Sequence, residues 1–335
     1  MTALPAPRPM AEAEGPLDLA RMRAAGQPVV LRGLAAHWPA VEAGRQGAEA
    51  TVAYLKALGP TRPVGAIAAH PDEGGRFFYN ADLTGMNFQR GSGPLPLFLD
   101  DLLRAGYVES PPALALQSEN IPDLFPSFTA HNRLDALAHV SPRIWIGNAI
   151  RVAAHYDVKE NVAVCMAGRR RFTLFPPEQI ANLYPGPLEQ TPAGTPVSMV
   201  DLAAPDLARF PRFAAAATTA LETTLEPGDA IYIPYCWWHA VQSLDSVNVL
   251  VNYWWSEGQL PGMGGAYDAL LHAILAIKHL PPDQRDVWRE WFDFYVFESG
   301  GDPAAHLPPH ARGALGPPDP AMFAEMRRML RQMLG

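Results

Sequence analysis

The chain has 335 residues, 48% of them hydrophobic, which is enough to bury a sizeable core in one large domain or two smaller ones. Its 26 basic and 34 acidic side chains give a formal net charge of -8, so we do not expect nucleic acid or an anionic membrane as a partner. No segment approaches the roughly 18 uninterrupted apolar residues that cross a bilayer, and the first residues lack the pattern of a signal peptide. Cys165 and Cys236 form no disulfide or zinc pattern, so we expect a cytoplasmic protein.

The first part of the chain, residues 1–140, mixes strand and helix patterns. Gln27–Leu34 is typical of a short buried strand that a glycine turn closes. Helical patterns follow at Ala50–Leu58 and Leu97–Ala105, and the aromatic stretch Arg76–Asn80 lies between them. We predict an α/β part that completes the barrel formed by the next segment.

The second part, residues 141–256, consists of short β-rich runs. Strands at such spacing are typical of a barrel or sandwich. Glu226–Asp229 has the proline and glycine of a type II turn, which leads the chain into one of these strands. We predict strands at Ile144–Ile146, Val162–Met166, Arg171–Phe175, Ala230–Ile233 and Val247–Trp255.

The last part, residues 257–335, returns to helical patterns. One helix has apolar residues at Leu270, Leu271, Ile274, Leu275 and Ile277, and a Gly/Pro-rich link from Ser299 to Pro320 precedes a second helix. That helix, Ala321–Leu334, gathers its apolar residues on one face, namely Met322, Phe323, Met326, Met329, Leu330 and Met333. We predict that it forms a homodimer. The alternative is that the helix packs onto the chain's own barrel.

A three-residue metal site is indicated by His155-Tyr156-Asp157 and by His239. On an extended chain residues i and i+2 face the same side, so His155 and Asp157 can bind one ion. Two histidines and one carboxylate form the facial triad of non-haem Fe(II) oxygenases, which leaves positions open for a co-substrate and O2. His-x-Asp alone is more often a hydrogen-bonded pair at a strand edge. The ordered set of His-x-Asp, Pro-Gly-Asp turn, Ile-Pro and aromatic-flanked histidine favours a metal site.

These motifs resemble the cupin-like branch of the jumonji-C oxygenases, the group that includes the asparaginyl hydroxylase acting on hypoxia-inducible factor. The similarity spans Gln27–Ser256, and it is densest in His155–Asp157, Asn161, Gly168–Pro177, Leu183–Pro185, Pro227–Asp229, Ile233–Pro234, Trp237–His239 and Val251–Trp254. The resemblance implies a double-stranded β-helix, a cupin or jelly-roll barrel that is mainly β with flanking helices. It also implies an Fe(II)- and 2-oxoglutarate-dependent dioxygenase that uses O2 to hydroxylate a protein side chain or a small molecule.

The resemblance assigns the co-substrate contacts as well. Arg170 stands where the family has a lysine that holds the far carboxylate of 2-oxoglutarate, and Asn161 and Asn252 match asparagines of the same pocket. Val152 and Leu114 stand where the hydroxylase has a threonine and a tyrosine that contact this carboxylate, so the co-substrate must be bound differently. Two other functions stay open, a metal-binding cupin without 2-oxoglutarate turnover and a structural or interaction protein with a vestigial site.

Overall fold

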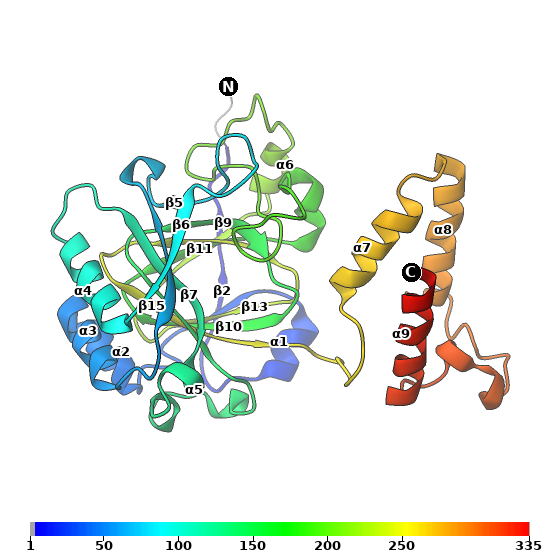
Figure 1. Ribbon diagram of the computed structural model, residues 1–335, viewed down its shortest axis with the longest axis horizontal. Coiled ribbons are helices and arrows are strands. Elements are labelled where there is room, and N and C mark those ends of the chain that lie inside the picture. Colours follow the sequence, from blue (N-terminus) through cyan, green and yellow to red (C-terminus); the bar gives the residue numbers. More distant parts are fainter. Residues whose placement is uncertain (1–3, 335) are drawn as a thin grey trace. The chain divides into compact units, whose positions relative to one another are not determined.

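The computed structural model describes residues 4–334, which divide into two compact units, Met1–Ser256 and Glu257–Gly335. The first unit contains all the strands named below and the second contains three long helices (Figure 1). The predicted residues 1–140 and 141–256 lie together in the first unit, and residues 257–335 form the second.

Two facing sheets form the first unit, in a jelly-roll sandwich of the kind that the strand spacing predicts. The six-stranded sheet has the order β1 (Arg8–Pro9), β12 (Leu221–Leu225), β11 (Arg170–Phe175), β14 (Trp238–Ser243), β9 (Arg151–Tyr156) and β5 (Arg76–Phe77). The nine-stranded sheet has the order β2 (Ala11–Ala13), β3 (Val29–Leu31), β13 (Ala230–Ile233), β10 (Glu160–Ala167), β15 (Asn248–Trp255), β8 (Arg143–Gly147), β7 (Ala113–Asn120), β4 (Val64–Ala69) and β6 (Phe88–Gly93).

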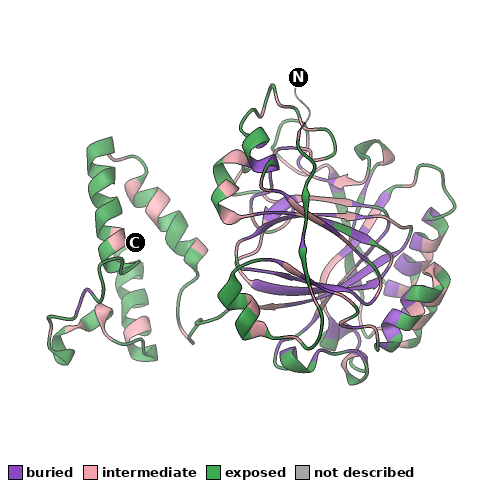
Figure 2. Ribbon diagram, turned by 180° about the vertical axis from the view of Figure 1, so that it is seen from behind, coloured by how far each residue is buried: buried purple, intermediate pink, exposed green. Residues whose placement is uncertain are grey.

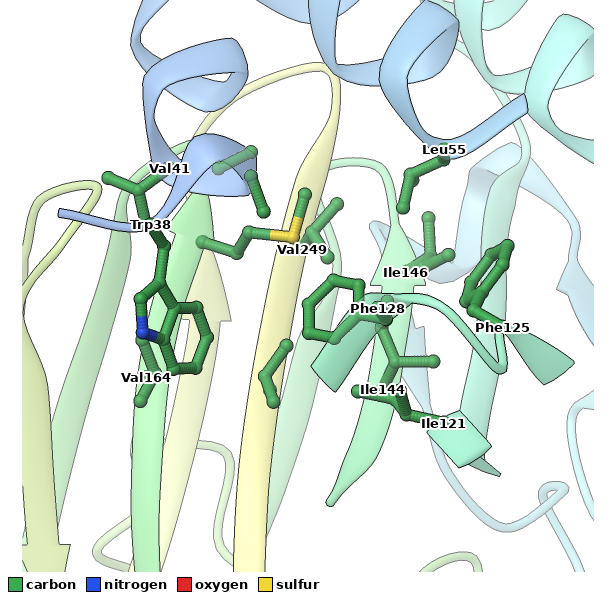
Figure 3. Close-up of a cluster of buried hydrophobic side chains, with 14 of the residues drawn as sticks. Trp38, Val41, Leu55, Ile121, Phe125, Phe128, Ile144, Ile146, Val164 and Val249 are labelled. Atoms are coloured by element: carbon green, nitrogen blue, oxygen red, sulfur yellow. The ribbon is translucent and has the colours of Figure 1, made fainter. Parts of the chain in front are cut away.

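Short helices connect and cover these sheets. They are α1 (Leu19–Ala25), α2 (Pro39–Gln46), α3 (Ala48–Ala57), α4 (Leu95–Ala105), α5 (Ile121–Leu124) and α6 (Phe213–Ala217), with 3-10 turns at Pro71–Glu73, Phe128–Ala130, Asp135–Leu137 and Pro177–Asn182. Apolar side chains of α2, α3 and α4 pack on the outer face of β10, β15 and β8. Figure 3 shows part of this core, where Trp38, Val41 and Leu55 approach the strand residues Val164, Val249 and Ile146. This packing holds the nine-stranded sheet rigid behind the barrel interior.

Gly168 fixes the start of β11. Its φ is +67°, and a Cβ at this position would lie 2.4 Å from the Oδ1 atom of Asn248 and 2.6 Å from the carbonyl oxygen of Val247. Any other residue would therefore clash as well as strain the backbone. The tight turn at Gly168 brings Arg170, Phe172 and Leu174 to the inner face of the six-stranded sheet, and Arg171 and Thr173 to its outer face.

The second unit consists of α7 (Ala266–Ile277), α8 (Pro282–Tyr295) and α9 (Pro320–Leu334), with 3-10 turns at Pro309–Ala311 and Gly313–Leu315 in the predicted link. Helix α8 was not among the elements predicted from sequence. None of the residues in these three helices, all of them within the described chain, is buried, and Figure 2 shows them almost entirely as exposed or intermediate. No helix within residues 4–334 has the length and apolar character needed to cross a membrane.

Candidate metal centre

A cavity of about 370 Å³ lies between the two sheets of the first unit. The inward-facing side chains of β9, β10, β11, β14 and β15 line it, and the segment 192–197 closes part of it. All six residues that the sequence nominates for metal or co-substrate binding lie on this one cavity, namely His155, Asp157, Asn161, Arg170, His239 and Asn252.

The three predicted metal ligands converge at the cavity wall. His155 is the last residue but one of β9, Asp157 directly follows the strand, and His239 lies opposite His155 on the neighbouring strand β14. One ligand atom from each of the three residues lies within 4.8 Å of the others, and the Nε2 atom of His239 is 3.5 Å from an Asp157 carboxylate oxygen. Both histidines are buried and Asp157 is partly exposed. Two imidazoles and one carboxylate in this arrangement can bind one face of a divalent metal and leave its other coordination positions open.

Backbone hydrogen bonds select the histidine tautomers. Nδ1 of His155 lies 3.0 Å from the carbonyl oxygen of Ala153, and Nδ1 of His239 lies 3.0 Å from that of Trp237. A carbonyl oxygen only accepts, so each Nδ1 carries the proton and each Nε2 keeps its lone pair for a metal. Burial, and then the neighbouring His155, lowers the pKa of His239 to about 4, so this ring is neutral at pH 7.

A β-bulge in β9 shapes the wall beside the metal ligands. His239 pairs with His155 and Val241 pairs with Val152, so two residues of β14 span three of β9. In a regular strand Val152 and His155 would face opposite sides, but the extra residue brings both to the cavity. Val152 therefore lines the cavity, and it presents an apolar side chain where the family resemblance has a threonine.

Arg170 is the one cation among the cavity-lining residues. The side chain is buried, and neither an ion pair nor a hydrogen bond joins it to any residue within 4–334. Burial lowers the pKa of its guanidinium to about 10, which still leaves it charged at neutral pH. An unpaired buried cation is costly unless an anion joins it. The cavity therefore suits a ligand that brings a carboxylate.

The two asparagines belong to a hydrogen-bonded chain that begins at a tryptophan. Nε1 of Trp145 donates to Oδ1 of Asn252 at 2.9 Å, and Nδ2 of Asn252 lies 3.4 Å from Oδ1 of Asn161. An indole N–H can only donate, so it determines which way both amides point. The amide nitrogen of Asn161 is left as a donor without an acceptor among the described residues.

Two further polar residues of the cavity wall, Gln117 and Ser118 of β7, were not nominated from sequence. The pairing of β7 with β8 shifts between Leu116 and Glu119, and Ser118 has a φ of 54°. This irregularity turns both side chains toward the cavity, and no local sequence signal announces it. Leu114, which was predicted to stand at a co-substrate contact, packs instead against the outer core. It lies before the irregularity, so its side chain faces away from the cavity.

Comparison with known proteins identifies the fold family. The cupin-like domain family matches residues 17–259, which include strands β3 to β15 and the three predicted metal ligands. The chain belongs to the cupin-like domain family. Its relatives include jumonji-C-type proteins whose names describe enzymes that act on lysine.

Three curated relatives illustrate this similarity. The chain is 35% identical over 131 residues to "Lysine-specific demethylase JMJ31" of Arabidopsis thaliana, and 38% identical over 148 residues to human "HSPB1-associated protein 1". These matches span 39% and 42% of this cupin-like chain but only 23% and 29% of the relatives. Human "Bifunctional peptidase and (3S)-lysyl hydroxylase JMJD7" is 28% identical over 264 residues, which cover 68% of this chain and 77% of the relative.

Proposed function

We propose that this cupin-like protein is an Fe(II)- and 2-oxoglutarate-dependent oxygenase. The observation that carries the proposal is the presence, in one cavity, of a His-Asp-His cluster and of a buried arginine that has no anionic partner among residues 4–334. A metal at the cluster and a dicarboxylate whose far end reaches Arg170 would satisfy both features at once. Bound together, Fe(II) and 2-oxoglutarate supply O2 activation.

The protein's own residues would position and protect these groups. The Nε2 atoms of His155 and His239 would donate neutral lone pairs, and Asp157 would balance part of the metal's charge. Arg170 would orient the dicarboxylate through its guanidinium, assisted by the free amide nitrogen of Asn161. Apolar walls from Phe172, Ile233, Val241 and Leu250 would keep water from the reacting groups.

The substrate proposal follows from the relatives. Two of them are named for chemistry on lysine, which makes a protein lysine the first substrate class to test. Asparagine hydroxylation and hydroxylation of a small molecule are the next candidates, in keeping with the motif resemblance described above.

Anaerobic titration separates this proposal from a metal-binding cupin without turnover. Fe(II) added first and 2-oxoglutarate second should produce the visible charge-transfer absorption of a chelated complex, without any substrate. Arg170→Met should shift the titration to higher 2-oxoglutarate concentrations. Iron binding without this absorption would favour the metal-binding cupin, and absence of iron binding would favour a vestigial site.

We also propose that the second unit forms a homodimer. Its helices carry large exposed apolar side chains, among them Trp288, Trp291 and Phe294 of α8 and Met329, Leu330 and Met333 of α9. No residue of the four hydrophobic clusters found in residues 4–334 comes from this unit. Apolar area of this extent needs cover, and a second copy presents the same surface.

Light scattering tests the dimer. The intact protein should have twice the chain mass at micromolar concentration, and Trp291→Glu should shift it toward monomer. Leu97→Glu, at an exposed leucine of α4, is the matched control and should leave the mass unchanged. A monomeric intact protein contradicts the proposal.

A further inference from the structure

Three arginines lie in one row across the outer face of the six-stranded sheet. The register pairs Arg76 of β5 with Arg151 of β9, Arg151 with Gln242 of β14, and Gln242 with Arg171 of β11. Cross-strand partners project from the same face, so all four side chains share it. Like charges directly opposite each other destabilise a sheet, which makes the Arg76–Arg151 pair an arrangement that needs a reason.

Acidic residues offset only part of this charge. Asp201 accepts from Nη1 of Arg151 at 3.2 and 3.4 Å and lies 3.8 Å from Nη1 of Arg76. Glu222, on β12, accepts from the hydroxyl of Thr173 at 3.1 Å. Arg171 has no ion pair within the described chain, and the one hydrogen bond of its side chain there is from Nη1 to the amide oxygen of Gln242, at 3.5 Å. Three cations therefore face two carboxylates.

The row borders a cavity of about 460 Å³, separate from the metal cavity and closed on one side by residues 200–203. Arg151 donates from Nε to the carbonyl oxygen of Gly74 and from Nη1 to Asp201. Its Nη2 has no acceptor among residues 4–334. The same holds for Nε and Nη2 of Arg171. Free N–H groups thus border this cavity from two strands.

The spacing suits one small anion. Arg151 and Arg171 are two strands apart, so their Cα atoms are about 10 Å from each other, a gap that two arginine side chains can close onto one group. A carboxylate is satisfied by one guanidinium fork, whereas the oxygens of a phosphate can accept from several directions. Gln242 and Thr173 add an amide and a hydroxyl to the same wall.

We propose that this outer cavity is a binding site for a phosphate group, inorganic or carried as a monoester by a small molecule, held by Arg151, Arg171 and Gln242. Arg76 adds positive charge to the same row, and its Cζ atom lies 3.6 Å from the ring centroid of Phe78. The site does not depend on the proposed oxygenase function. It lies on the reverse of the same strands, since Arg151, Arg171 and Gln242 each adjoin a residue that faces the metal cavity.

Calorimetric titration of the metal-free full chain with inorganic phosphate at constant ionic strength tests the proposal. We expect one site with a dissociation constant of about 1 mM or lower. Arg171→Gln should weaken binding by about tenfold or more, as for loss of a hydrogen bond to a charged group, and Arg171→Lys should weaken it less. Arg171 is exposed and has no ion pair, so these variants should fold.

Arg170→Met is the matched control, because it removes the adjacent arginine that faces the other cavity. It should leave phosphate binding unchanged. Phenyl phosphate in place of inorganic phosphate distinguishes the sources, since equal or tighter binding indicates a phosphorylated molecule and weaker binding indicates free phosphate. The proposal is overturned if no phosphate binds, if acetate binds as well, if Arg171→Gln has no effect, or if Arg170→Met abolishes binding.

Discussion

The two faces of the six-stranded sheet handle positive charge in opposite ways. On the inner face Arg170 lies buried and alone, and the remaining wall is neutral apart from the metal cluster. On the outer face three arginines lie in a row at a surface cavity, where Asp201 forms ion pairs with Arg76 and Arg151 and Glu222 lies on the same wall. A single buried cation that has no ion pair among the described residues favours the binding of an anion such as a carboxylate. The outer row keeps solvent and acidic neighbours, so it suits a more weakly held anion.

The largest expected effect concerns the metal ligands of the inner face. His155→Ala or His239→Ala should abolish Fe(II) retention and 2-oxoglutarate consumption, because one imidazole and one carboxylate bind the metal too weakly to retain it. Asp157→Ala should reduce Fe(II) retention and 2-oxoglutarate consumption less completely, because both imidazoles remain as ligands. The iron content after gel filtration and the rate of 2-oxoglutarate consumption measure these effects. Parental iron content and turnover in all three variants would show that the cluster is not the metal site.

The next effect concerns the isolated cation. Arg170→Met should weaken 2-oxoglutarate binding to the Mn(II)-loaded protein by about 1.5–3 kcal/mol, the range for losing a hydrogen bond to a charged group, and Arg170→Lys should weaken it less. Arg171→Gln, the neighbour on the outer face, is the control and should leave this affinity unchanged. Calorimetry gives all three values. Equal losses in Arg170→Met and Arg171→Gln would erase the distinction between the two faces.

A smaller effect is expected from the amide chain. Trp145→Phe removes the indole N–H that orients Asn252 and, through it, Asn161, so the Asn161 amide should lose its fixed direction. We expect 2-oxoglutarate affinity to fall by about 0.5–1.5 kcal/mol while Fe(II) affinity is retained. Trp254→Phe, at a neighbouring indole whose N–H has no partner among the described residues, is the control. A loss of Fe(II) binding in Trp145→Phe would point to general disruption of the barrel.

The smallest effect is a gain. Val152→Thr keeps the shape of the side chain and adds a hydroxyl to the cavity wall that the β9 bulge exposes. A hydrogen bond to a bound carboxylate should improve 2-oxoglutarate affinity by up to about 1 kcal/mol. Titration of the Mn(II)-loaded protein measures the change. A clear loss of affinity would mean that the co-substrate contacts this wall through apolar groups only.

Much of the barrel could be predicted from the sequence because its signals are local. The strand Ala230–Ile233 was predicted with the bounds that the structure has, and five of the six nominated cavity residues lie on strands, with Asp157 directly after β9. Helix α8 was missed although its large apolar residues, among them Trp288, Trp291 and Tyr295, recur at helical spacing.

The parts that could not be predicted depend on register. Gln117 and Ser118 reach the cavity only because the pairing of β7 shifts, and Leu114 faces the other way for the same reason. The outer row is equally invisible, because Arg76, Arg151 and Arg171 are far apart in the chain and become neighbours only through three strand pairings. Local periodicity contains no information on which strands lie side by side.

The turn at Gly168 determines which residues of β11 lie on the inner and the outer face of the six-stranded sheet. A residue inserted or deleted at this turn would advance β11 by one position, and Arg171 or Arg169 would then enter the metal cavity while Arg170 moved to the outer surface. Phe172 and Leu174 would leave the interior in the same step. The strand therefore tolerates no change of length at its start, and insertions and deletions in this protein should be confined to loops that do not set the register of β11.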